Sequence, residues 1–349
     1  MESQIRDKNF IVETNIKRDG LKYIDIEECE EMVLHGGIKI IDGRYRRLPE
    51  ELAKSVNECV DEMHDRTAGG RVRFITNSPY IAIHAETVSV LKMNHIPITG
   101  SVGMDLYSGT RYYGTFVPPF GVQDVFESVI DLDGEEREYT INLPLYSGVK
   151  RLYVGIKEGC TLKAPSPYRL DKPVVYYGSS ITQGGCASRP GVAYQSILTR
   201  ELHIDHINMG FSGGARGEDP IVDHVAGLEM SAFVSDYDHN APSVDHLRAT
   251  HEKLYRAVRK NHPDIPILFL TRPKYHLTAE ELQRLDVVRA TYEKALSEGD
   301  SNVYFIPGPE LLNEQVRECC LVDNTHPTDA GFVSMAYAIL PTLKKMLDL

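Results

Sequence analysis

"PVVYYGSSITQGG", residues 173–185, decides the fold of the second half of the chain. Its apolar and aromatic residues form a short run without polar interruption, which is typical of a strand buried on both faces. The run ends at Gly178, and two adjacent serines, Ser179 and Ser180, open a polar, glycine-rich segment. We therefore predict a buried strand that carries two hydroxyl groups at its carboxyl end.

Four further apolar runs follow, and helical patterns lie between them. The runs are HINMGF (206–211), SAFVSDY (231–237), IPILFLTRP (265–273) and NVYFIPG (302–308). Helices are expected over 243–260 and 278–297, the second with Thr278 and Glu281 at the spacing of a capping box. This second helix is expected to bury Leu282, Leu285, Val288 and Leu296. The alternation predicts an α/β fold whose parallel sheet is covered on both faces.

The first half of the chain has a different pattern. Apolar and polar residues alternate in YIAIHAETVSV (80–90), REYTINLPLY (137–146) and RLYVGI (151–156). Such short strands predict an antiparallel β-sandwich, which one helix over 48–64 interrupts. A polar, proline-rich segment, 159–173, separates the two patterns. We therefore predict a sandwich domain over 1–168 and an α/β domain over 169–349.

The composition argues against several classes of partner. The 349 residues carry a formal net charge of −12 and no block of basic residues, so nucleic acid and anionic membranes are not expected as partners. The N-terminus lacks the apolar core of a signal peptide, and no stretch approaches the roughly 20 apolar residues of a membrane span. Six scattered cysteines without a C-x-x-C pair predict free thiols in a cytoplasmic protein, with no metal and no cofactor.

Polar residues follow several of the predicted strands, where an α/β sheet binds its ligands. Serine is a weak nucleophile until a base removes its proton, and a histidine oriented by a carboxylate does this well. Asp323 and His326 are three residues apart, so one turn can bring them together. A glycine N–H and an asparagine amide after other strands could stabilise an oxyanion. The residue types therefore suit acyl transfer.

The polar segments resemble the conserved blocks of the SGNH/GDSL hydrolase superfamily, in order and in spacing. The segments are GSSITQG (178–184), FSGG (211–214), DHNA (238–241) and DNTH (323–326). GMDLY (103–107) and AGGRVRFITNSPYIAI (68–83) resemble the sandwich that precedes such domains in the GxDLY subfamily of esterases. The resemblance implies a flavodoxin-like three-layer SGNH domain behind a jelly-roll-like sandwich.

The resemblance also implies roles for individual residues. Ser180 falls on the nucleophile of the family, and Ser179 takes the position of the family's aspartate. His326 is then the base, and Asp323 orients it. Gly213 and Asn240 would complete an oxyanion hole with the N–H of Ser180. The family's third block is matched most loosely here, so a neighbour of Asn240 could fill its role.

Other roles stay open for several of these residues. A serine before a helix commonly caps it, and Asp323 with His326 could be a surface turn. His239 is expected beside the site, where it could contact substrate. Arg189 and Arg272 could bind a polar substrate or form structural ion pairs.

The expected function is that of a metal-independent serine esterase. The resemblance implies removal of small acyl groups, foremost acetyl, from a small-molecule or oligosaccharide ester. An acyltransferase that uses the same triad is the main alternative, because the chemistry is shared until the second nucleophile arrives. A carbohydrate-binding protein with a decayed hydrolase domain is a further alternative. A homodimer or higher homo-oligomer stays open.

Overall fold

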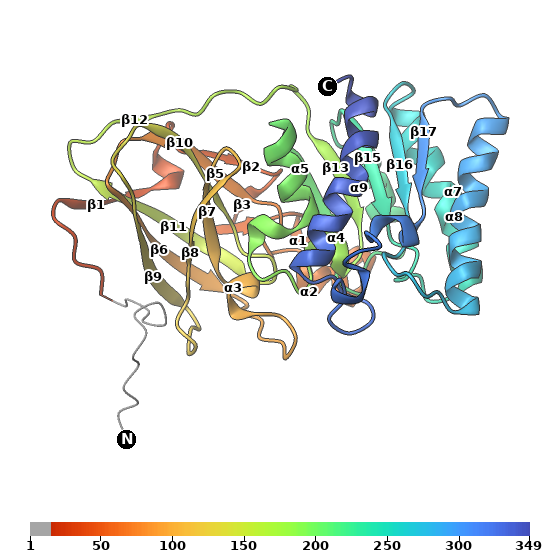
Figure 1. Cartoon of the computed structure of the whole chain (residues 1–349), viewed down its shortest axis with the longest axis horizontal. Helices are drawn as coiled ribbons and strands as arrows, with labels where there is room; N and C mark the ends of the chain where they lie inside the picture. The colour runs from red at the N-terminus through yellow and green to blue at the C-terminus, as the bar shows by residue number, and fades with distance from the viewer. Residues whose placement is uncertain (1–14) are drawn as a thin grey trace.

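A computed structural model describes residues 15–349, in which an antiparallel β-sandwich lies beside an α/β layer structure (Figure 1). One sandwich sheet has the order β1 (Leu21–Asp25), β11 (Gly148–Lys157), β6 (Tyr80–Val88), β9 (Val125–Asp131). The other has the order β12 (Leu162–Lys163), β5 (Arg71–Thr76), β10 (Arg137–Asn142), β7 (Met104–Ser108), β8 (Arg111–Phe116), with β2 (Val33–His35) also paired to β5. The predicted sandwich is thus confirmed.

The predicted helix over 48–64 is wrong in one respect, because the segment forms two helices. These are α1 (Glu50–Val56) and α2 (Glu58–Met63), which follow the small hairpin of β3 (Lys39–Ile41) and β4 (Arg44–Arg46). Asn57 between them is extended, and its side chain accepts a hydrogen bond from the Val60 N–H, as an N-cap does. The apolar periodicity runs through this break, so it could not reveal the break.

The two helices pack on the α/β part rather than inside the sandwich. Ala53, Val60 and Met63 are buried in the same apolar cluster as the strands of the parallel sheet. Helix α1 lies against α6 (Asp219–Ala226) of the second half. The first half of the chain therefore contributes a piece of the second half's core.

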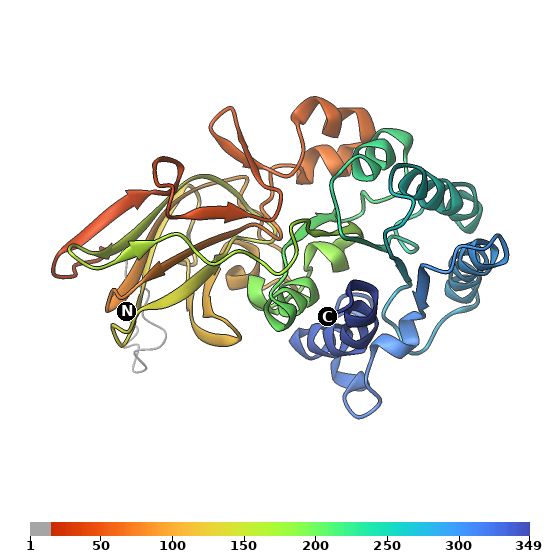
Figure 2. The same cartoon turned by 90° about the horizontal axis from the view of Figure 1, so that it is seen from above.

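The five predicted strands of the second half form one parallel sheet. Its order is β14 (His206–Gly210), β13 (Val174–Gly178), β15 (Ala232–Asp236), β16 (Ile267–Leu270), β17 (Val303–Ile306). Seen from above, α5 (Tyr194–Leu202) and α9 (Asp329–Leu347) cover one face, and α6, α7 (Val244–Asn261) and α8 (Ala279–Ser297) cover the other (Figure 2). This is the flavodoxin-like three-layer arrangement that was expected.

Helix α8 begins where it was predicted to begin, but the prediction of its buried face was wrong in part. Thr278 and Glu281 form both hydrogen bonds of a capping box. Leu285 and Val288 are buried, but Leu282 and Leu296 are 49% and 42% exposed. The buried stripe of α8 runs through Arg284, Val288, Thr291 and Ala295, so Leu282 and Leu296 lie to one side of it and stay in solvent. No helix within residues 15–349 is long and apolar enough to cross a membrane.

The GMDLY segment joins the sandwich to the α/β part. Asp105 in β7 is fully buried, and its carboxylate accepts hydrogen bonds from Asn142 Nδ2 at 2.8 Å and from the Gly191 N–H at 2.8 Å. Arg189 adds an ion pair to Asp105 at 3.2 Å and a hydrogen bond to the Tyr107 hydroxyl. This motif therefore anchors the segment that follows α4 (Ser180–Gln183).

Candidate active site

Ser180 and His326 meet at the carboxyl edge of the parallel sheet. Ser180 is the first residue of α4, directly beyond β13, and its Oγ lies 2.8 Å from His326 Nε2. His326 Nδ1 lies 2.7 Å from Asp323 Oδ2. The histidine thus bridges a hydroxyl and a carboxylate through its two ring nitrogens. In this geometry the carboxylate fixes the tautomer, and the free lone pair on Nε2 faces the hydroxyl.

Ser179, rather than Ser180, caps the helix. The Ser179 Oγ accepts a hydrogen bond from the Ile181 N–H at 3.0 Å, which leaves the Ser180 hydroxyl free to face His326. The Ser179 N–H donates to Asp236 Oδ1 at 3.1 Å. Asp236 ends β15, the neighbouring strand, so a carboxylate from that strand holds the turn that carries Ser179 and Ser180.

Asp236 is itself completely buried. Burial raises its pKa to about 6, although His239, hydrogen bonds from Thr182 and the Ser179 N–H all act in the opposite direction. Glycine is required beside this carboxylate, because a Cβ at Gly178 would lie 1.9 Å from Asp236 Oδ1. Close packing at this point therefore fixes the path of the chain into Ser180.

The segment that carries the histidine is more open to solvent. The Asp323 side chain is 37% exposed and that of His326 21%. Asp323 Oδ1 accepts hydrogen bonds from the N–H groups of Thr325 at 3.1 Å and His326 at 2.8 Å. Burial raises the pKa of Asp323, but the hydrogen bonds from the His326 N–H and ring outweigh it, and the pKa lies below its ordinary value. The carboxylate therefore stays ionised in mildly acidic solution.

Arg272 lies behind this segment. Its guanidinium pairs with Glu281 at 2.7 Å and donates a hydrogen bond to the Thr325 hydroxyl. Lys274 pairs with the same Glu281 carboxylate at 2.9 Å. The structure thus gives Arg272 the ion pair that was one of its two predicted roles. Its hydrogen bond to Thr325 also links it to the residue directly before His326. Arg189 likewise forms its ion pair, with Asp105, at the junction of the two halves.

Gly213 and Asn240 lie on the turns after the two neighbouring strands. In the turn after β14, the N–H groups of Ser212, Gly214 and Ala215 all donate to acceptors within the protein. The Gly213 N–H has no such acceptor among the described residues, and Gly213 has φ +69°, a conformation that suits glycine. Asn240 Nδ2 donates to the Phe211 carbonyl at 3.1 Å, which uses one of its two hydrogens. Both groups therefore retain a donor for a ligand.

His239 contacts the carboxylate of its neighbour. Its Nδ1 lies 3.2 Å from Asp238 Oδ1, and its Nε2 is buried without a partner among the described residues. Among the described residues the ring of His239 forms no hydrogen bond with Ser180, whose Oγ contacts His326 Nε2 instead.

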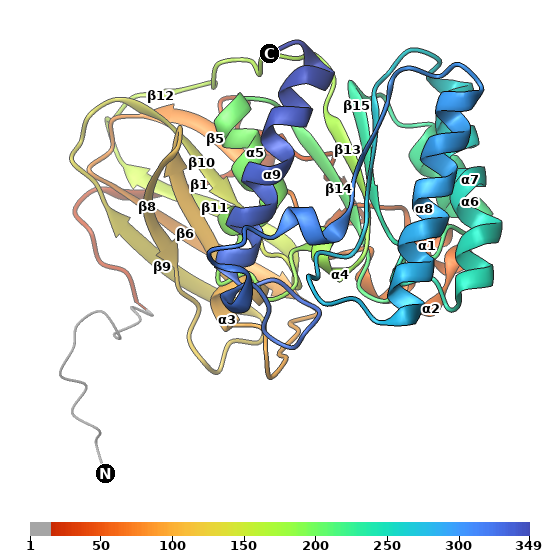
Figure 3. The same ribbon diagram turned by 45° about the vertical axis from the view of Figure 1, so that its right-hand side comes forward.

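Two residues near His326 were missed as parts of the site. His95 comes from the segment ahead of α3 (Ile98–Ser101), and its Nε2 lies 4.0 Å from Asp323 Oδ2. Figure 3 shows the segment ahead of α3 and the loop ahead of α9 at the same, lower end of the molecule. Cys186 follows α4 and is buried, which raises the pKa of its thiol to about 12, so the thiol is protonated when no cation is bound. No spacing in the sequence links either residue to His326. The packing of the two halves brings His95 there, and the fold of the α/β part brings Cys186 there.

Two family models match the chain, and together they span most of it. The GDSL-like lipase/acylhydrolase model matches residues 171–344. A model for the N-terminus of SGNH-hydrolase-type esterases, GxDLY, matches residues 21–162. Comparison with curated proteins finds no match.

Solved structures with the same two-part layout are also similar. One, described as a GDSL-like lipase from Bacteroides ovatus, is 27% identical, with a TM-score of 0.82 over 94% of this chain and 98% of its own. The salicylyl-acyltransferase SsfX3 of a tetracycline biosynthetic pathway is 19% identical, with a TM-score of 0.76 over 95% and 98%. A family two carbohydrate esterase from Clostridium thermocellum, solved with cellohexaose, is 15% identical, with a TM-score of 0.60 over 91% and 99%.

Proposed function

The chain belongs to the GDSL-like lipase/acylhydrolase family of carboxylic ester hydrolases, and on that premise we propose that it removes small acyl groups, foremost acetyl, from carbohydrate esters. The observation that carries the proposal is the continuous chain of contacts from the Ser180 Oγ through the His326 ring to the Asp323 carboxylate, at 2.8 and 2.7 Å. These are the contacts that make a serine hydroxyl nucleophilic.

The first half of the proposed reaction forms an acyl-enzyme. His326 Nε2 takes the proton of the Ser180 hydroxyl while Oγ attacks the ester carbonyl carbon. Asp323 remains ionised and stabilises the imidazolium that results. The tetrahedral intermediate then collapses, the C–O bond to the sugar breaks, and His326 returns its proton to the leaving alkoxide. The sugar leaves as a free alcohol, and the acyl group stays on Ser180.

Oxyanion stabilisation is assigned to three donors. The N–H of Ser180 belongs to the first turn of α4, where helix N–H groups have no intrahelical partner. The unpaired Gly213 N–H and the second hydrogen of Asn240 Nδ2 complete the set. Removing one such donor typically costs about 10²–10³-fold in kcat. Hydrolysis ends when His326 deprotonates a water that attacks the acyl-enzyme and restores the Ser180 hydroxyl.

Support for a sugar ester comes from structures of similar fold. Family two carbohydrate esterases from Clostridium thermocellum and Cellvibrio japonicus share the whole layout, and so does an acetyl xylan esterase from Butyrivibrio proteoclasticus. Their low identity supports only the fold, so the acetyl sugar stays our proposal. An oligosaccharide rather than a polymer is the proposed substrate.

Acyl transfer to another acceptor is the second candidate. The salicylyl-acyltransferase SsfX3 has a higher TM-score, 0.76, than the carbohydrate esterases named above. Transfer and hydrolysis share every step up to the acyl-enzyme, so the same residues serve both. The difference lies in whether water or an acceptor alcohol attacks.

The test measures acetate release from 4-nitrophenyl acetate and from acetylated xylo-, manno- and cello-oligosaccharides. Ser180→Ala is compared with Ser55→Ala. Ser55 is an exposed serine in helix α1, distant from Ser180 in the sequence, and its substitution is the matched control. We expect release from one sugar class by wild type and by the control, and a loss of at least about 10³-fold in Ser180→Ala. Equal release by Ser180→Ala would overturn the catalytic assignment.

The same experiment separates the alternatives. Acyl adducts formed only when an acceptor alcohol is added would favour transfer. Tight oligosaccharide binding with no turnover of any ester would favour the carbohydrate-binding protein that lacks catalysis.

A further inference from the structure

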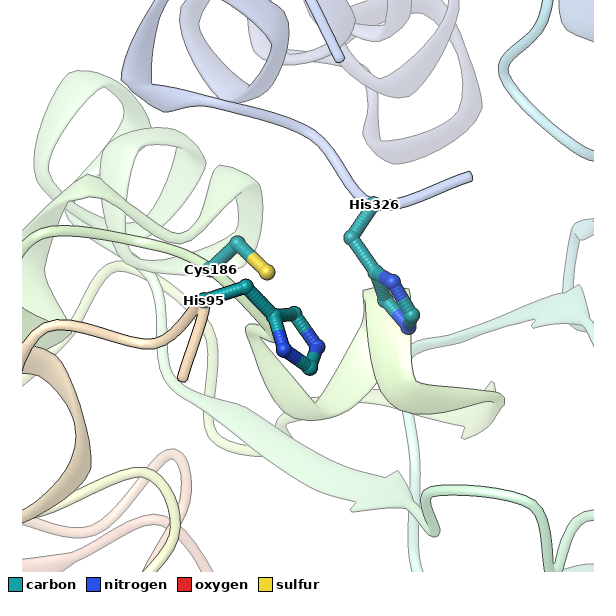
Figure 4. Close-up of side chains that lie close together, drawn as sticks. All are labelled: His95, Cys186 and His326. Atoms are coloured by element: carbon teal, nitrogen blue, oxygen red, sulfur yellow. The ribbon is translucent and has the colours of Figure 1, made fainter. Parts of the chain in front are cut away.

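Three potential metal ligands meet beside the proposed triad. His95 comes from the sandwich, Cys186 from the segment after α4, and His326 from the loop ahead of α9 (Figure 4). Their ligand atoms all lie within 4.8 Å of one another. Atoms around one tetrahedral zinc ion are roughly 3.3–3.8 Å apart, as bonds of about 2.0–2.3 Å require. Shifts of about 1 Å would therefore close the three side chains around one cation.

The donor set favours a particular class of cation. Two imidazole nitrogens and one thiolate suit zinc and other thiophilic ions, whereas calcium and magnesium require oxygen ligands. Asp323 Oδ2 lies 4.0 Å from His95 Nε2 but holds His326 Nδ1 at 2.7 Å, so a solvent molecule is the expected fourth ligand. The side chain of His95 is 33% exposed, so solvent reaches the cluster from this side.

We propose that His95, Cys186 and His326 form an inhibitory site for Zn²⁺ or a similar thiophilic cation. The cation would bind as an inhibitor and take no part in ester cleavage. The Cys186 thiol gives up its proton to solvent, and the thiolate forms the bond to the ion. Inhibition follows from the proposed function, because it depends on His326 being the base.

Both ring nitrogens of His326 are already used in the proposed triad. Nε2 faces the Ser180 hydroxyl and Nδ1 faces Asp323. A cation on Nε2 takes the lone pair that would accept the serine proton. A cation on Nδ1 forces the ring proton onto Nε2, which then has no lone pair for that proton. Binding through either nitrogen therefore removes the base.

The sandwich contributes His95, the third ligand of the proposed cation site. Cys186 and His326 both belong to the α/β part, but His95 reaches them only because the sandwich packs against that part. The ring of His95 lies 5.6 Å from that of His326, centroid to centroid. A chain that lacked this sandwich segment would keep the triad and lose the third ligand.

Binding is tested without any substrate. Cd²⁺ is titrated into the full chain, and the ultraviolet charge-transfer absorbance of the cadmium–thiolate bond is recorded. Cys186→Ser is compared with Cys319→Ser, which removes an exposed thiol next to a second cysteine and so controls for binding elsewhere. We expect the band that saturates at the lowest Cd²⁺ concentration to be lost in Cys186→Ser alone. Its persistence in Cys186→Ser would overturn the site, whatever the enzyme acts on.

Inhibition is tested by labelling Ser180 with a fluorophosphonate in increasing Zn²⁺, with reversal by EDTA. His95→Ala is compared with His84→Ala, a sandwich histidine paired with Glu127 at 2.9 Å. Labelling should slow with Zn²⁺ in wild type and in His84→Ala. Removing His95 should raise the Zn²⁺ concentration for half inhibition by at least about 10–100-fold, because that range is typical for losing even an outer partner of a metal ligand.

The outcomes separate the two proposals. Equal sensitivity of His95→Ala and wild type would overturn the inhibitory site. Failure of wild type to react with the fluorophosphonate would count against the proposed function, and the cadmium titration would still decide whether the cation binds.

Discussion

The turn that carries Ser180 and the loop that carries His326 contribute the two halves of one proposed triad, yet they are built in different ways. Residues 178–187 are all buried, and side chains of Gln195 and Asn208 donate to the Thr182 carbonyl at 2.7 and 2.6 Å. In residues 321–328 only Pro327 is buried. The first is fixed by the packed core of the fold, and the second by a few local hydrogen bonds.

This difference indicates how each half responds to substitution. A change in the buried turn disturbs the parallel sheet around it, so its main effect should be a lower free energy of unfolding. A change in the exposed loop leaves the core intact, so it should cost activity alone. Four substitutions test this contrast, and they are ordered from the largest expected effect.

Asp323→Asn should have the largest effect and leave the fold intact. The amide cannot stabilise the imidazolium and permits the wrong tautomer of His326, so kcat should fall by about 10⁴-fold. Because the side chain is 37% exposed, the melting temperature should change little. Steady-state kinetics and thermal unfolding of the same preparation test this. A large loss of melting temperature would break the contrast.

Gly178→Ala should mainly destabilise the protein. The added Cβ would lie 1.9 Å from Asp236 Oδ1 and 2.3 Å from Thr182 Oγ1, in a region without room to relax. We expect a loss of about 3 kcal/mol or more in the free energy of unfolding, measured by denaturant titration. Gly121→Ala is the control, because nothing lies within 4 Å of its Cβ. Equal stability of the two variants would contradict the packing argument.

Asp236→Asn should remove a pH dependence of stability. Burial raises the pKa of this carboxyl to about 6, whereas an unfolded aspartate has a pKa of about 3.9. Between these values the unfolded chain has lost the proton that the folded chain keeps, so stability is present at low pH and is lost as the pH rises through about 6. The loss amounts to about 3 kcal/mol.

The asparagine variant cannot ionise. Between pH 4 and pH 7 its free energy of unfolding should therefore rise relative to that of wild type by about 2 kcal/mol, most of the total. Denaturant titrations of both proteins across that range measure the gain. Parallel curves for the two proteins would show that the carboxyl does not titrate as expected.

Arg272→Ala should have the smallest effect, and a diagnostic one. If Arg272 positions the loop through Thr325, kcat should fall about 10-fold with KM unchanged, because the histidine is displaced from its productive position. If it binds substrate, KM should rise instead. Arg289→Ala, which removes an exposed arginine paired with Asp286, controls for the loss of charge. A rise in KM alone would give Arg272 its other predicted role.

Much of the fold was predictable because buried parallel strands are continuous apolar runs. All five such runs became strands of one sheet, and the residue types after them marked its carboxyl edge. The contact of Asp323 with His326 was predictable for a local reason, since three residues of chain separate them. The antiparallel sandwich followed from the alternation of its strands in the same way.

Features that depend on contacts between distant segments were not predictable. The break at Asn57 follows from a cap inside an unbroken apolar pattern, and the exposure of Leu282 follows from which side of α8 packs inward. The hydrogen bond from the Ser179 N–H to Asp236 connects the ends of two neighbouring strands that are 57 residues apart in sequence. The approach of His95 to His326 requires the two halves to pack first.

The placement of α1 and α2 has a consequence for synthesis on the ribosome. Their apolar faces, with Val60 and Met63, are covered only when partners such as α6 have been made. At about 5–20 residues per second, translation from Met63 to Ala226 takes roughly 10 to 30 seconds. Helices of seven and six residues are not stable alone, so during that interval segment 50–63 is an unfolded stretch with exposed apolar side chains. Such a stretch is a binding site for chaperones until the second half emerges.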